Sequence, residues 1–198
     1  MGEFDPAAAV TFDMAFGHVH LDGAPHRVLV PAETLLELAL AAGEDALADL
    51  GHALGEPMGR RVGTRLAEGD GEGEPAERRK RAVRAARPET VVSQLSGELA
   101  LAGLGALSAE RWGRAIVWVV DQSPFGEGGD PLVAHILQGA LRAMVDSPAR
   151  MVPLQREGVR ARFLVVSGAA VEDVRTRLAK GDHWSAVIAA MHTKGEPS

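Results

Sequence analysis

The chain has 198 residues, of which 46% are hydrophobic and 24% charged, and it carries a net charge of −6 with a pI near 5.6. That length fits one domain with a full core, and the acidic balance argues against general nucleic-acid binding, which favours basic domains. Cysteine is absent, which excludes disulfides, thiolate metal sites and cysteine nucleophiles and suits a cytoplasmic location. The longest apolar stretches, 34–42 and 116–120, are too short to span a bilayer.

Residues 1–9 have neither the basic segment nor the apolar core of a signal peptide, and we expect them to be flexible. Apolar and polar residues then alternate from Val10 to Leu21, which is the pattern of a half-buried strand. Asp22-Gly23 is a hairpin-type turn signal, so residues 27–30 can return as a second strand.

Three histidines lie in this predicted hairpin. His18 and His20 are two residues apart and point the same way on a strand, and His26 lies just across the turn. Three imidazoles suit zinc or copper, but only Asp22 is available to complete such a site. Histidines on an exposed hairpin more often meet water, so we predict surface histidines and no cofactor, with a metal site as the alternative.

Two helices are predicted next. Apolar spacing after Pro31 indicates a helix ending near Ala42, Gly43 interrupts it, and a second helix runs from Glu44 toward Leu66. Pro57 lies inside that second pattern and is expected to kink or divide it.

The second helix carries a glycine stripe, defined by Gly51, Gly55, Gly59 and Gly63, each four residues from the next. Residues four apart share one face of a helix, and each glycine costs about 1 kcal/mol against alanine, so the stripe needs a compensating close contact. The contact could be another helix of this chain, a second copy of the chain or a ligand. We predict an assembly face that forms a homodimer, with a different protein partner as the alternative.

Residues 68–81 begin with an acidic, glycine-rich stretch, which predicts a mobile charged loop. A basic run follows at Arg78, Arg79, Lys80, Arg81, Arg84 and Arg87. It could bind anionic lipid, nucleic acid or an acidic partner, but no aromatic residue is interleaved for base stacking, and a solvated helix face is the favoured interpretation.

The remaining pattern predicts an α+β fold in a single domain, 1–198, with an antiparallel sheet packed against a helical layer. Its predicted elements are a helix from Pro88 or Glu89 to Ala102, a strand at 116–120 covered on both faces, a helix from Asp130 to Val145, a strand pair at 151–154 and 159–166, and helices from Val171 to Met191, before a flexible tail at 193–198.

From about Arg27 to His192, the order of these segments resembles the 4-vinyl-reductase-type domain family, which shares its fold with the Bet3-like subunits of the TRAPP vesicle-tethering complex. The matching pieces are the sequences at 47–55 and 101–107, Ser123-Pro124 after a strand, Gly139-Ala140-Leu141 within the helix at 130–145, and the strand at 162–166.

The resemblance implies a small-molecule sensor of the kind found in bacterial regulators of aromatic catabolism, an accessory factor in pigment synthesis, or a dimerising scaffold. Relatives that use cysteines for acylation or metal binding have no counterpart in this chain. The resemblance therefore transfers neither a covalent lipid nor a cysteine metal site.

A hydrolase would need Ser123 and His135 to meet Asp121 or Asp130. The sequence has no Gly-x-Ser-x-Gly elbow and no evident oxyanion hole, and Asp130 is better placed to cap its helix. We therefore predict that the chain is not an enzyme.

A sensor needs an apolar cavity between sheet and helices, and the predicted walls of this ligand pocket are Trp118, Phe163, Ile136 and Ala140. The alternative is that these residues are simply core. The sequence thus favours a small-molecule-sensing or adaptor module that is homodimeric and cytoplasmic. A scaffold joined to another protein through the glycine stripe comes second, and an enzyme or metal-binding protein third.

Overall fold

The computed structural model describes residues 9–21, 24–68 and 73–193, with the backbone alone for 24–27 and 192–193. In chain order, the elements are β1 (Val10–Asp13), β2 (His18–Leu21), β3 (Ala24–Arg27), α1 (Ala32–Ala41), α2 (Glu44–Leu66), α3 (Pro75–Ala85), α4 (Pro88–Leu101), β4 (Ala106–Trp112), β5 (Ala115–Asp121), α5 (Asp130–Val145), β6 (Arg150–Glu157), β7 (Arg160–Val166), α6 (Val171–Ala179) and α7 (Trp184–Thr193).

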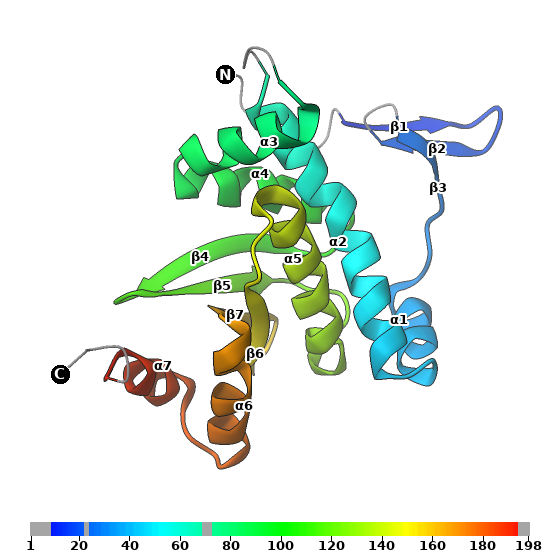
Figure 1. Cartoon of the computed structure of the whole chain (residues 1–198). Coiled ribbons are helices and arrows are strands. Elements are labelled where there is room, and N and C mark those ends of the chain that lie inside the picture. The colour runs from blue at the N-terminus through cyan, green and yellow to red at the C-terminus, as the bar shows by residue number, and fades with distance from the viewer. Residues whose placement is uncertain (1–8, 22–23, 69–72, 194–198) are drawn as a thin grey trace.

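The main sheet has four antiparallel strands in the order β4-β5-β7-β6 (Figure 1). Side chains of β5 alternate between two cores. Trp118 and Val120 belong to the core shared with α2, α4 and α5, whereas Val117 and Val119 belong to the core shared with α6 and α7. The predicted coverage of this strand on both faces and the α+β fold class are confirmed, because β-branched residues on both faces need apolar cover.

The glycine stripe lies against helices of the same chain. A β-carbon on Gly55 or Gly59 would meet the backbone of α5 at Ile136 and Ala140, and one on Gly51 would meet His135. Gly63 faces the aliphatic side chain of Arg79 in α3. The stripe is buried by these contacts and is not a free face for a second copy or another protein. The predicted assembly role is corrected accordingly.

Pro57 was expected to kink or divide this helix, and division does not occur, because α2 is continuous from Glu44 to Leu66. A proline inside a helix removes one backbone hydrogen bond. Packing along the glycine stripe on both sides of Pro57 compensates for that loss, because bare backbone lets α2 and α5 approach closely.

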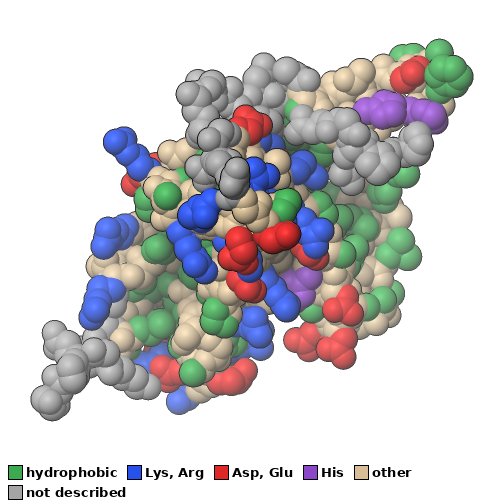
Figure 2. Space-filling model, turned by 45° about the horizontal axis from the view of Figure 1, so that its top comes forward, with side chains coloured by type: hydrophobic (Ala, Val, Ile, Leu, Met, Phe, Trp, Pro, Cys, Tyr) green, Lys and Arg blue, Asp and Glu red, His purple; other side chains and the backbone are tan. Residues whose placement is uncertain are grey.

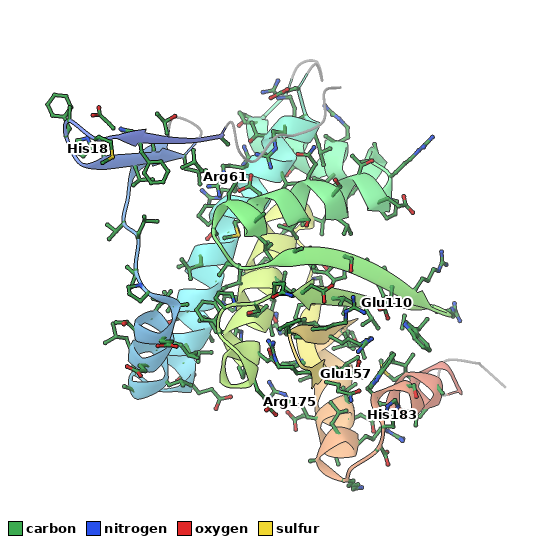
Figure 3. The ribbon with its side chains drawn as sticks, turned by 180° about the vertical axis from the view of Figure 1, so that it is seen from behind. His18, Arg61, Glu110, Glu157, Arg175 and His183 are labelled. Atoms are coloured by element: carbon green, nitrogen blue, oxygen red, sulfur yellow. The ribbon has the colours of Figure 1, made fainter. Side chains whose placement is uncertain are left out.

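The N-terminal segment forms three short antiparallel strands rather than the predicted pair, because the chain turns at residues 14–17. This sheet projects from the helical body as an arm (Figures 1 and 3). Large apolar side chains are exposed on the arm, on the segment that follows it and on α1: Phe12, Met14, Phe16, Val28, Leu29, Val30, Leu38 and Leu40.

Residues 75–81, expected within a mobile loop, form the first part of α3. Pro75 stands in its first turn, where proline is tolerated, and Ala82 and Val83 anchor the helix by burial. Residues 69–72, and nearly all of the terminal segments predicted to be flexible, lie outside the described residues. Among the helices described, none is long and apolar enough to cross a membrane.

Candidate functional site

An apolar groove of about 790 Å³ lies between α4 and the outer end of the β4–β5 hairpin. Helix α4 presents small residues to it at helical spacing, including Ser93, Ser96, Gly97 and Ala100. The strands add Leu107, Ala109 and Ile116, among other residues. The groove exists because α4 offers too little side-chain volume here to fill the space above the hairpin.

Polar residues also border the groove, and some of their groups are already hydrogen-bonded within the protein. The Leu107 amide donates a hydrogen bond to Ser96 Oγ at 3.0 Å, which ties α4 to β4 at one end. The charged residues Glu89, Glu110, Arg111 and Arg114 also border the groove. The Glu110 carboxylate, however, accepts a hydrogen bond from Trp112 Nε1 at 3.0 Å. An apolar interior with a few fixed polar groups is typical of small-molecule sites.

The predicted pocket residues Trp118, Phe163, Ile136 and Ala140 do lie in one cluster, and all four are buried. Trp118 stands opposite Phe163 in the β5–β7 register. None of these four residues lines the apolar groove. Trp118 nevertheless adjoins the apolar groove, because its partner on β4 is Ala109, which lines it.

Helix α4 is fixed to α2 by a buried ion cluster. The Glu98 side chain is fully buried and pairs with Arg61 at 2.6 Å and with Arg65 at 2.5 Å. Arg65 Nε also donates to Gln94 Oε1 at 2.8 Å. Figure 3 shows Arg61 at the junction of these helices. A buried carboxylate is tolerated only with such partners, so the cluster fixes one wall of the groove.

The residues weighed for a hydrolase do not converge. Asp121 accepts hydrogen bonds from Arg160, and Asp130 pairs with Arg156 instead of capping α5. The His135 ring contacts that of His52 edge to face, with centroids 5.3 Å apart. Burial, and then the charge of neighbouring His52, lower the pKa of His135.

His18 and His20 lie on β2 with ring centroids 5.8 Å apart, so they share a face as predicted. The His26 side chain falls outside the described residues. Within the described part of the chain, no three histidine or acidic side chains are grouped to hold a metal ion.

Sequence reasoning missed the apolar groove. The small residues of α4 recur at three- and four-residue intervals, and that signal was available in the sequence. The glycine stripe of α2 is the more regular pattern of small residues, but α5 packs directly against it and leaves no open space.

No protein-family model matches the chain, and neither does any curated protein sequence. Among solved structures, it is similar to the phenol-responsive sensory domain of the transcription activator PoxR, crystallised with phenol. The TM-score is 0.53 at 16% sequence identity, over 87% of this chain and 92% of the other. At that identity the likeness shows the fold alone.

Proposed function

We propose that this protein is a non-enzymatic sensory module of the 4-vinyl-reductase type that binds a small apolar molecule. The observation that carries the proposal is the apolar groove beside Trp118, in a chain whose fold follows a phenol-responsive domain over nearly its full length. Its volume of about 790 Å³ lies within the range usual for ligand sites.

The ligand class follows from the lining. Val92, Leu107 and Ile116 supply apolar contact, and Ser93 offers a hydroxyl group that can bind one polar substituent. We therefore propose a small aromatic molecule with at most one or two polar groups. A site between Trp118, Phe163, Ile136 and Ala140 would require their packed side chains to separate, so the groove is the preferred location.

The test is titration of phenol and other small aromatics into a chain carrying Trp112→Phe and Trp184→Phe, in which Trp118 is the remaining tryptophan. We expect saturable quenching and a rise in melting temperature, since a ligand that binds only the folded state stabilises it. Native mass spectrometry of freshly purified protein would show any retained molecule.

Ala109→Phe fills the apolar groove and is expected to abolish the response. Ala53→Phe, at an exposed position of α2 that does not line the groove, is the matched control. A folded protein whose Trp118 signal ignores every aromatic probe would contradict the proposal.

We further propose that the module is a homodimer and that the partner copy covers the N-terminal arm. Phe12, Met14 and Phe16 are 57%, 86% and 75% exposed, and a short sheet without apolar cover is marginally stable. Light scattering should give a dimer for the native chain and a monomer for Phe12→Ser/Phe16→Ser. A native monomer would refute this part of the proposal.

A further inference from the structure

A second hollow, of about 540 Å³, lies between α2, α3 and α5. We call it the cationic hollow, and its charged or titratable lining residues are His52, Glu56, Arg60, Arg79, Lys80, Arg142 and Asp146. Figure 2 shows charged side chains of both signs gathered in the middle of the face that these helices form. Its polar lining distinguishes it from the apolar groove.

The two carboxylates of the cationic hollow already have cationic partners. Glu56 pairs with Arg60 one helical turn along α2, and Asp146 pairs with Lys80 at 3.2 Å. Arg79 and Arg142 have no carboxylate partner among the residues that the structure describes. The hollow thus carries two excess positive charges on a protein whose net charge is −6.

Arg79 is held in place by the glycine stripe. Its Cβ, Cγ and Cδ atoms lie 3.1, 3.5 and 3.4 Å from the position of a β-carbon on Gly63, so the side chain runs along the bare backbone of α2. A half-buried aliphatic stem loses less conformational entropy when its guanidinium binds a ligand. The arrangement therefore presents this guanidinium already ordered.

His52 adds a neutral hydrogen-bond donor. The Met151 amide donates to Gln138 Oε1 at 3.3 Å, so the Gln138 amide nitrogen faces His52 Nε2, 2.9 Å away, and donates to it. With Nε2 accepting, the ring proton of neutral His52 is on Nδ1. Burial and then the charges of Arg142 and Arg150 lower the pKa of His52, which keeps the ring neutral near pH 7.

We propose that the cationic hollow binds the anionic group, a carboxylate or a phosphate, of a small molecule between Arg79 and Arg142. Guanidinium groups bind these planar or tetrahedral oxyanions through paired charge-assisted hydrogen bonds. The walls are preformed, because α2 and α5 meet backbone to backbone directly beneath at Gly55 and Gly59. The site is separate from the apolar groove and does not depend on the sensory function proposed above.

The test titrates inorganic phosphate, acetate and benzoate separately into the full chain at constant ionic strength, following the melting temperature and the His52 ring signals by NMR. At least one of these anions should raise the melting temperature saturably and shift the His52 signals. Arg79→Gln and Arg142→Gln should each weaken that binding about tenfold or more, as expected for losing a charged hydrogen-bond partner. A response to phosphate or to the carboxylates identifies the anionic group.

Arg81→Gln is the control, since Arg81 is an exposed residue of the same basic run that does not line the hollow. Its binding should match that of the native chain. Equal weakening in all three variants would indicate general charge attraction and overturn the proposal, as would the absence of any saturable response. If Arg79→Gln impairs folding, the exposed Arg142 still provides the decisive variant.

Discussion

The carbonyl oxygen of Ile136 occupies the place that a β-carbon on Gly55 would take. The obstruction is backbone rather than the end of a flexible side chain, so it cannot rotate away. The α2–α5 contact therefore requires glycine at this position, although glycine is a poor helix former.

Gly55→Ala is expected to destabilise the protein by about 3 kcal/mol, toward the upper end of overpacking effects, although alanine is intrinsically the better helix former. Urea denaturation measures the change in free energy of unfolding. Gly168→Ala, where nothing lies within 4 Å of the new β-carbon, should be nearly silent. Equal free energies of unfolding for the two variants would show that α2 and α5 do not meet backbone to backbone at Gly55.

Glu98→Gln is expected to cost about 3 kcal/mol of stability, because removing one charge from a buried cluster leaves the others uncompensated. Arg61 and Arg65 would then face a neutral amide, although each side chain is about a fifth exposed and retains some contact with water. Glu56→Gln removes only an exposed pair with Arg60 and should change stability by less than about 1 kcal/mol. Chemical denaturation of both variants under one set of conditions gives the comparison.

Stability should fall as the pH drops below 6.5, the unfolded-state pKa of histidine. Burial, as the largest cause, depresses the pKa of both His52 and His135 in the folded protein. The unfolded chain therefore takes up protons first, and the free energy of unfolding declines until the folded pKa values are reached.

Denaturation at about pH 7 and about pH 5.5, above the range in which most carboxylates titrate, measures this decline. The His52→Gln/His135→Gln variant should show a shallower dependence than the native chain. A slope as steep as that of the native protein would assign the effect to other groups.

Trp184→Ala is expected to release α7 from the sheet. The Trp184 ring meets that of Trp112 edge to face with centroids 4.8 Å apart, and Arg162 lies over it at 5.2 Å. Hydrogen exchange of the α7 amides should accelerate strongly, since this docking stabilises the helix. Trp112→Phe retains an aromatic ring at the contact and should preserve most of the protection.

Sequence pattern predicted the elements that are strongly periodic or buried on both faces, such as β5 and α5. It missed β4, an edge strand in which Ser108 and Glu110 interrupt the apolar signal. Glycine spacing correctly indicated a close approach along α2, but spacing holds no information about which chain supplies the other side. The small residues of α4 were likewise visible in the sequence, but whether they leave a groove depends on how far α4 stands from the hairpin.

The Glu98 cluster joining α4 to α2 has a mechanical consequence for the apolar groove. Helix α2 packs in turn against the backbone of α5. The helical wall of the groove is therefore rigid, and the β4–β5 hairpin is the wall that can move. The outer end of that hairpin carries Trp112, which touches Trp184 of α7. We therefore expect any molecule that widens the groove to displace the hairpin outward. Through the Trp112–Trp184 contact, this displacement would change the packing of α7.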